Sequence, residues 1–273
     1  MGMTLFACMD AVSKHLTTSL PIVEILWVRY ALFTLFGLLM ALSLGGIVSL
    51  RTKMLKLQIV RGFAMLGDIA LFTLSFRFMQ LAEAHAIAAI APLMVMAFAV
   101  PLLGEKVSRR QWMAVSTGLI GVLVIVRPET NLFQPISILP FLATVSFSLY
   151  IILTRLVGKY DNLATSVFYT GVIGLTVLTA VAPFYWRTPT AEEGAWLVAA
   201  SCLGVGAHIC VIRGLSLSEA SILQPFNYVL LIGAIILGFV VFGSFPNATT
   251  VVGALIVIVS GLYAWYLARV SDS

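Results

Sequence analysis

Long apolar segments follow one another along almost the entire chain. Hydrophobic residues make up 61% of the 273 residues, charged residues make up only 10%, and the mean hydropathy is +1.07. A water-soluble domain is typically about one quarter charged, so this chain cannot cover its surface with polar side chains. Many of the apolar segments approach the roughly 20 residues that a helix needs to cross the hydrocarbon core of a bilayer. The sequence therefore predicts an all-α integral membrane protein.

Apolar length, turn signals and flanking charges divide the chain into ten expected spans with short connections. The expected spans are residues 2–17, 22–48, 55–79, 83–104, 109–127, 136–157, 163–185, 191–213, 218–243 and 248–269. They leave no room for a domain outside the membrane. The first segment lacks a basic n-region and a cleavage site, so we expect it to stay as a span. It is short and begins almost at Met1, and we expect a few residues upstream of it.

Lys and Arg residues are distributed unevenly between the two sides of these spans. Alternating assignment places eleven on or near one side and three on the other. The eleven are Arg51, Lys53, Lys56, Arg61, Lys106, Arg109, Arg110, Arg155, Lys159, Arg213 and Arg269, and the three are Arg77, Arg127 and Arg187. Because cytoplasmic connections carry the basic excess, we expect both termini on the cytoplasmic side of the membrane.

Weak internal similarity recurs at an offset of about 140 residues. Matching pieces are Gly104-Glu105 with Gly243-Ser244, Lys14-His15-Leu16 with Thr154-Arg155-Leu156, and Leu81-x-Glu83-Ala84 with Leu217-x-Glu219-Ala220. The common order predicts two repeats, residues 1–128 and 136–270. Five spans per repeat is an odd number, so the halves should cross the membrane in opposite directions. Inverted repeats are typical of secondary carriers, whose substrate site lies near the bilayer midplane at the repeat interface.

The stretch from Asp10 to Tyr30 carries ionisable groups into the first two spans, where such groups usually face a partner or a polar passage. Asp10 and Lys14 are four residues apart, so they share a helix face and can pair. The pair is either a polar spot that meets a zwitterionic or cationic substrate, or a structural ion pair. Arg29 can receive a carboxylate or phosphate with both arms of its guanidinium, or it can pair with Glu24 or with Asp68 of another span.

Asp68 is the lone acid in the middle of the third span. It can couple transport to protons, bind a cationic group, or pair with Lys14 or Arg29. His85 and His208 are each either packed, hydrogen-bonded side chains or lining residues. His208 is the stronger candidate for a lining residue, because small residues surround it on its helix.

Pro92 and Pro225 lie at similar places in the two repeats. Proline interrupts a helix, and interruptions at matching positions point to a transporter's binding region. Gln224, Asn227 and Tyr228 add hydrogen-bonding groups beside Pro225. Among the aromatic residues inside spans, Phe72 and Tyr150 can stack on a flat ligand.

Several function classes are disfavoured by what the sequence lacks. It contains no phosphate-binding Gly loop, no nucleophile elbow and no metal-ligand spacing, so we expect no enzyme activity, cofactor or metal. It has no clustered basic face for nucleic acid. Without an ATP motif, the driving force must be a gradient or an exchange.

The motif D-x-x-S-K-H-L-x-T-x-L-x-x-x-E-I-x-x-x-R-Y at residues 10–30 resembles the EamA-like families of the drug/metabolite transporter superfamily. It is similar in particular to the S-adenosylmethionine and riboflavin carriers of bacteria. Other matching pieces are Arg61-Gly62, Glu83-Ala84, Ala91-Pro92, Gly104-Glu105 with Trp112, and Pro225 with Tyr228. Ser244 stands in the second repeat where the first repeat has Glu105, so the gates of the two halves are chemically unequal.

The resemblance implies ten helices in two inverted repeats around a cavity lined mainly by helices 1, 3, 4, 6, 8 and 9. We expect substrate contacts from Asp10, Lys14, Arg29, Asp68, Phe72, Pro92, Tyr150, His208, Gln224, Asn227 and Tyr228. The expected function is secondary transport of a small metabolite by alternating access, with a proton or an exchanged metabolite as partner. S-adenosylmethionine would place its sulfonium on Asp10 or Asp68 and its carboxylate on Arg29 or Lys14; riboflavin would use stacking and amide hydrogen bonds. Export of amino acids or drugs, or a non-transporting scaffold, are the alternatives.

Overall fold

The computed structural model describes residues 1–44, 46–104, 108–126, 135–217, 223 and 226–271, and all regular elements in these ranges are helices. In chain order they are α1 (Gly2–Leu16), α2 (Ile22–Leu44), η1 (Ile47–Leu50), α3 (Leu55–Ser75), α4 (Leu81–Ala88), α5 (Ala91–Leu103), α6 (Arg109–Val126), η2 (Pro135–Ser137), α7 (Ile138–Val157), α8 (Leu163–Val181), η3 (Ala182–Phe184), α9 (Ala191–Leu217), α11 (Asn227–Phe242) and α12 (Ala248–Ser271). Because α4 and α5 share one apolar segment, Leu81–Leu103, the α-helices of the described ranges group into ten. Seven of these are long and apolar enough to cross a membrane, and α11 is a shorter apolar helix. The predicted all-α membrane fold of ten helices is confirmed.

Helix ends follow the local sequence. Gly104 and Gly243, which the internal similarity aligns, end α5 and α11 in the left-handed conformation, with φ of 72° and 62°. Glycine adopts this conformation without steric cost. Asn162 begins α8 because its side-chain oxygen accepts a hydrogen bond from the Thr165 backbone N–H at 2.8 Å. Pro92 lies in the first turn of α5, just after the interruption that ends α4, which explains why the fourth span is broken.

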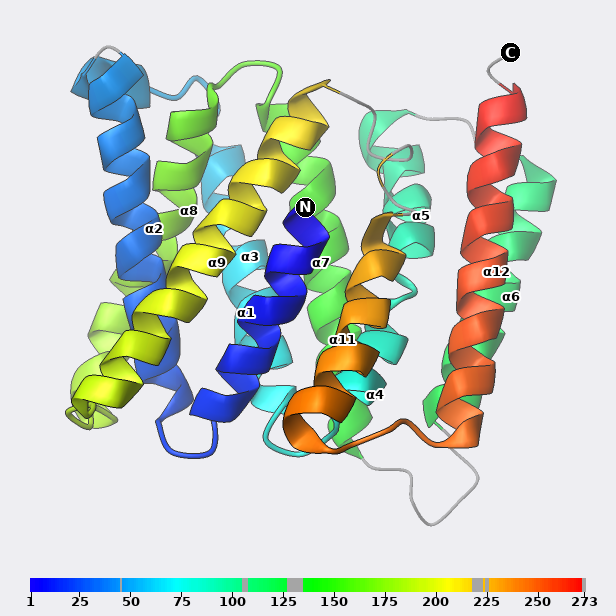
Figure 1. The fold of residues 1–273 in the computed structure, drawn as a ribbon. Coiled ribbons are helices and arrows are strands. Elements are labelled where there is room, and N and C mark those ends of the chain that lie inside the picture. The colour runs from blue at the N-terminus through cyan, green and yellow to red at the C-terminus, as the bar shows by residue number, and fades with distance from the viewer. Residues whose placement is uncertain (45, 105–107, 127–134, 218–222, 224–225, 272–273) are drawn as a thin grey trace.

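Glycines let two pairs of helices approach closely at opposite ends of the bundle: α2 with α8, and α6 with α12 (Figure 1). A Cβ atom added to Gly37 of α2 would lie 2.5 Å from the Phe168 backbone of α8. A Cβ on Gly121 of α6 would lie 2.9 Å from the carbonyl oxygen of Gly253, and one on Gly253 would lie 2.7 Å from that of Gly121. Close backbone packing through small residues is how helices associate where no water drives them together.

The two halves of the chain exchange packing partners. α1 packs against α9 and α11, while its counterpart α7 packs against α3 and α5. The α7–α8 turn lies beside η1, since Asn162 donates to the Ser49 carbonyl; we call this the N-terminal side. The α1–α2 turn (residues 17–21) lies on the opposite side, which we call the far side (Figure 1). Two repeats of opposite direction would give this pattern.

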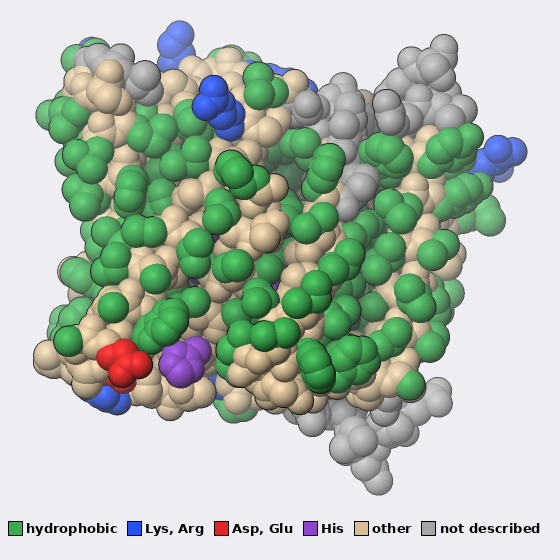
Figure 2. Space-filling view, in the orientation of Figure 1, with side chains coloured by type: hydrophobic (Ala, Val, Ile, Leu, Met, Phe, Trp, Pro, Cys, Tyr) green, Lys and Arg blue, Asp and Glu red, His purple; other side chains and the backbone are tan. Residues whose placement is uncertain are grey.

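The outer surface is apolar where lipid would contact it. Leu35, Leu39 and Leu42 of α2 are about half exposed, as are many large apolar side chains on α6, α11 and α12. Figure 2 shows hydrophobic side chains across the middle of one face, with Lys, Arg, Asp and Glu near its margins. This distribution fits a multi-pass membrane protein.

Candidate substrate-binding site

A cavity of about 90 Å³ lies at the centre of the bundle. Its lining residues come from seven of the spans: Met3, Phe6, Met9, Asp10, Arg29, Asp68, Ile69, Phe72, Thr73, His85, Ala88, Ala89, Ala91, Thr144, Phe147, His208, Asn227, Leu230 and Leu231. All six spans that the resemblance implies contribute, and α2 adds Arg29. Among the described residues, its ionisable lining groups are Asp10, Arg29, Asp68, His85 and His208.

Asp10 of α1 pairs with His85 of α4. The Asp10 Oδ2 and the His85 Nε2 are 3.2 Å apart, and both side chains are buried. The contact is within ion-pair distance but is not aligned as a hydrogen bond. The structure therefore sets an imidazole, rather than the predicted Lys14, beside the Asp10 carboxylate.

Arg29 and Asp68 face the same cavity without an ion pair or hydrogen bond to any residue that the structure describes. Asp10 and Asp68 are the carboxylates whose charges act on the Arg29 guanidinium. Gly204 of α9 makes room for Arg29, since a Cβ there would lie 3.2 Å from the Arg29 Nε. The expected pairing of Arg29 with Glu24 does not form: Glu24 instead accepts the Arg187 backbone N–H at 3.3 Å.

His208 of α9 forms part of the cavity wall. Its Nδ1 lies 2.8 Å from the Gly204 carbonyl oxygen. Because a carbonyl can only accept, Nδ1 carries a proton there. The ring packs edge-on against Phe6 at 4.6 Å and Phe33 at 5.1 Å between centroids. His208 therefore has both the packed role and the lining role that the sequence left open.

Aromatic rings form the apolar part of the wall. Phe6, Phe72 and Phe147 come from α1, α3 and α7. The Phe72 ring also lies 4.9 Å from the His85 ring. Such faces can hold a flat ring of a ligand while the charged groups bind its polar end.

Six of the predicted contact residues surround this one cavity: Asp10, Arg29, Asp68, Phe72, His208 and Asn227. Lys14 does not line it, and the hypothesis that Lys14 pairs with Asp10 is wrong. The Lys14 Nζ donates to the carbonyl oxygens of Met79 at 2.6 Å and Phe76 at 3.3 Å, beyond the end of α3. Those carbonyls lack partners within α3 and attract a cation.

Pro92, Tyr150 and Tyr228 also stand outside the lining. Pro92 is buried at the start of α5, where it interrupts the span. Tyr150 lies behind His208, with ring centroids 6.1 Å apart. Tyr228 points to α12, where its hydroxyl reaches the Val257 carbonyl at 3.5 Å. Gln224, like Pro225, lies outside the described residues.

Most lining residues that the sequence did not single out are apolar or small, such as Met3, Met9 and Phe147. No residue type separates them from side chains that face lipid. The sequence left His85 open between a packed and a lining role, and the structure places it in the cavity lining.

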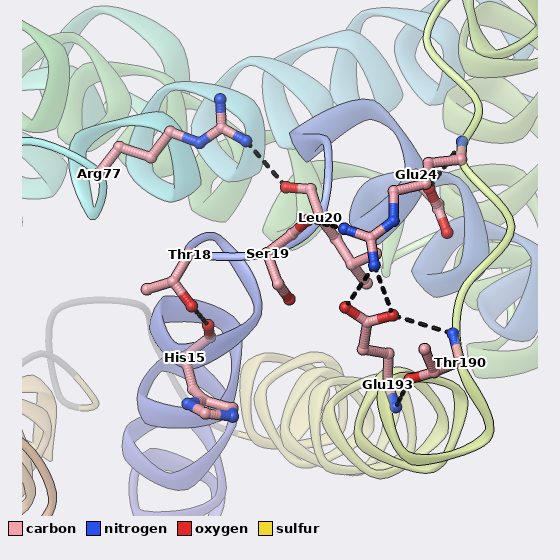
Figure 3. Close-up of polar contacts among 9 residues, drawn as sticks. His15, Thr18, Ser19, Leu20, Glu24, Arg77, Thr190 and Glu193 are labelled. Atoms are coloured by element: carbon pink, nitrogen blue, oxygen red, sulfur yellow. Dashed lines mark hydrogen bonds and ion pairs between the residues drawn. The ribbon is translucent and has the colours of Figure 1, made fainter.

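Three basic side chains on the far side line a hollow of about 840 Å³ and donate to backbone carbonyl oxygens there; we call Lys14, Arg77 and Arg187 the far-side latch. Arg77 donates to the carbonyl oxygens of Thr17 at 3.3 Å and Leu20 at 2.8 Å in the α1–α2 turn. Figure 3 shows this turn with Arg77 on one side of it and Glu193 and Thr190 on the other.

Arg187 completes the latch from the second half of the chain. It donates to the Ser19 carbonyl oxygen at 2.7 Å and pairs with Glu193 at 3.1 Å. The α1–α2 turn is thus held by cations from the α3–α4 and α8–α9 connections. The hollow at the latch shares no lining residue with the central cavity, whereas a hollow of about 250 Å³ toward the N-terminal side shares Met3 and Asn227 with it.

Removing Arg187 from the latch is expected to expose the cavity to the far side. The Arg187 side chain is half exposed, so each of its contacts contributes about 0.2–1 kcal/mol, and Arg187→Ala should raise labelling of a Thr73→Cys reporter about threefold. The reagent is an impermeant thiol compound added from the far side, with Cys8, Cys202 and Cys210 replaced. Glu192→Gln, an exposed change nearby, is the control. Equal labelling of both variants would contradict a closing role for the latch.

Together, the ten helical spans and the buried, charged central cavity define the class of small-molecule membrane transporters. The chain belongs to the EamA-like transporter family, which matches residues 1–127 and 134–265. This confirms the family resemblance of the sequence. It also confirms that the chain is a transporter and not an enzyme, because the family and the named relatives are transporters.

The similar proteins agree with this family. The chain is 26% identical over 264 residues to the S-adenosylmethionine uptake transporter of Rickettsia prowazekii, covering 97% of this chain and 90% of that one. It is 26% identical to the riboflavin transporter of Vibrio cholerae (93% and 87% covered) and 24% identical to the pseudopaline exporter CntI of Pseudomonas aeruginosa (93% and 90%). A crystal structure with 17% identity matches with a TM-score of 0.74 over 98% of this chain and 96% of that one, which supports the fold.

Proposed function

We propose that this protein is a secondary active transporter of a small metabolite of the S-adenosylmethionine kind, working by alternating access in a bacterial inner membrane. One observation carries the proposal: a guanidinium, Arg29, and a carboxylate, Asp68, both without partners among the described residues, face one cavity. Buried charges are costly in a membrane and usually serve a function. A ligand with a carboxylate and a cationic group would supply both missing partners.

The geometry suggests how such a ligand binds. Its carboxylate meets Arg29, which can hold both oxygens. Its ammonium or sulfonium meets Asp68 or Asp10, and a base ring stacks beside Phe72 or Phe147. The S-adenosylmethionine transporter relatives support this substrate class. Riboflavin is the second candidate, favoured by the aromatic wall and by a relative, but it has no pair of opposite charges to meet Arg29 and Asp68.

The difference between the two sides supports alternating access. The cavity shares lining residues with a hollow on the N-terminal side, but none with the hollow at the latch. At about 90 Å³ the cavity is smaller than the ~300–1,000 Å³ of ligand pockets, so it must widen to admit a metabolite. We propose that two inverted repeats, residues 1–128 and 136–270, rock around it. The exchange of helix partners supports this, and the basic excess supports cytoplasmic termini.

Uptake into proteoliposomes tests the substrate. We expect saturable accumulation of radiolabelled S-adenosylmethionine that unlabelled compound competes away, with riboflavin and an amino-acid pool as the other substrates. Asp68→Asn should abolish accumulation, and the exposed Glu192→Gln should leave it unchanged. Uptake of riboflavin alone would overturn the zwitterion proposal. No uptake, but efflux from loaded vesicles, would favour the exporter alternative.

A further inference from the structure

His85 lies beside the acidic groups of the cavity. Two carboxyl groups, Asp10 and Asp68, face a single guanidinium, Arg29, so the cavity carries one excess negative charge when both are ionised. An unbalanced buried charge is strongly disfavoured in a membrane. His85, 3.2 Å from Asp10, is the group placed to restore neutrality by holding a proton.

Other charged groups near His85 are already engaged. Glu83, on the same helix, accepts the Gln80 backbone N–H at the start of α4. Lys14, one turn from Asp10, is bonded to carbonyls at the end of α3. From α3 the imidazole meets the rings of Phe72 and Phe76. Among the described lining residues, the helices α5, α7 and α11 add no charge, and α9 adds His208, bonded to Gly204.

We propose that His85 is the proton-binding residue of this site, and that its proton and the cationic group of the substrate compete for the Asp10 carboxylate. The inference rests on the proposed function, which it deepens by naming the coupled ion and its residue. It differs from the sequence-based hypothesis that Asp68 carries the proton.

The competition has a definite charge balance. In the empty site, protonated His85 pairs with Asp10 and the cavity is neutral. S-adenosylmethionine carries an ammonium, a sulfonium and a carboxylate, and so brings one net positive charge. When its cation takes over Asp10, the proton leaves the His85 Nε2 for water on the open side, and the loaded cavity is neutral again. One proton is therefore exchanged for each cationic substrate.

The demethylated compound S-adenosylhomocysteine provides a matched control. It has nearly the same shape but lacks the sulfonium charge, so it brings no net charge to the cavity. Its binding should leave the proton on His85. The two ligands thus separate a charge-driven exchange from a general effect of filling the cavity.

Calorimetry of ligand binding to the purified full-length protein, in buffers of different ionisation enthalpy, measures the released protons. We expect release approaching one proton for S-adenosylmethionine as the pH falls, and about none for S-adenosylhomocysteine. Where His85 is protonated, S-adenosylmethionine affinity should weaken about tenfold for each unit by which the pH falls, as for any ligand that displaces one proton. His85→Gln should bind without release and without this pH dependence. Release that persists in His85→Gln, or binding without release in the unchanged protein, overturns the proposal.

A ligand-free measurement keeps the inference testable if neither compound binds. The chain has three histidines, so nitrogen-15 histidine labelling gives few signals, and His85→Gln assigns one of them. We expect an imidazolium signal at His85 that Asp10→Asn converts to a neutral imidazole at the same pH, because the adjacent carboxylate is then absent. The His15 signal should not change. A neutral His85 throughout overturns the proton site, whereas a protonated His85 with no ligand binding overturns only the substrate.

Discussion

Arg29→Gln should reduce the uptake of S-adenosylmethionine about 100-fold while the protein still folds. The guanidinium is buried beside the cavity, and Asp10 and Asp68 are the charges acting on it. Truncating one partner of a buried charge contact costs about 2–5 kcal/mol, and each 1.36 kcal/mol is tenfold. Gln keeps a polar end but cannot balance the substrate carboxylate. Initial rates in proteoliposomes measure the effect.

Two further variants separate charge from geometry at Arg29. Arg29→Lys keeps the charge but loses the planar fork, so it should retain transport with a raised KM. Gly204→Ala places a Cβ 3.2 Å from the Arg29 Nε and 2.9 Å from the Met9 Sδ, so it should displace the guanidinium and lower uptake without removing any charge. Arg213→Gln, at an exposed position of α9, is the control. If Arg29→Gln took up S-adenosylmethionine as fast as Arg213→Gln, a binding role for Arg29 would be contradicted.

The ten spans were predictable because a bilayer imposes one length on every helix. Even the interruption of the fourth span followed from Pro92, whose ring excludes a continuous helix. The repeat alignment placed Gly104 opposite Gly243, and both prove to be left-handed helix ends. These features depend on residue type and local spacing, which a single sequence contains.

The side-chain partners were less predictable, because they depend on helices far apart in the chain. Spacing correctly placed Asp10 and Lys14 on one face, but it could not show that two free carbonyls beyond α3 would hold Lys14. Tyr228 has the residue type of a site yet faces α12. The sequence singled out Asp10, Arg29 and Asp68, which line the cavity, because charge inside an apolar span is rare enough to stand out.

Substitutions of Arg61 should have the largest effect on stability. Arg61→Lys, the chemically conservative change, should destabilise the protein more than Arg61→Met does. Its guanidinium is wholly buried and donates to the Gln58 Oε1 at 3.1 Å and to the Thr170 Oγ1 at 2.8 Å. It also donates to the Thr154 hydroxyl and the Ser166 carbonyl. These acceptors join α3 to α7 and α8. In the part of the chain that the structure describes, no carboxylate lies within ion-pair distance of it.

Arg61→Lys should lower the free energy of unfolding by about 3–5 kcal/mol, because a single ammonium cannot reach acceptors on three helices and leaves a poorly bonded buried charge. Arg61→Met removes the charge and retains most of the volume, so the loss should stay within about 2 kcal/mol. Reversible unfolding in mixed micelles compares the two, with Arg213→Lys and Arg213→Met as matched controls. If Arg61→Met lowered the free energy of unfolding more than Arg61→Lys, the positive charge itself would stabilise the packing of α3, α7 and α8. The several hydrogen bonds of the guanidinium would then not be what holds the three helices together.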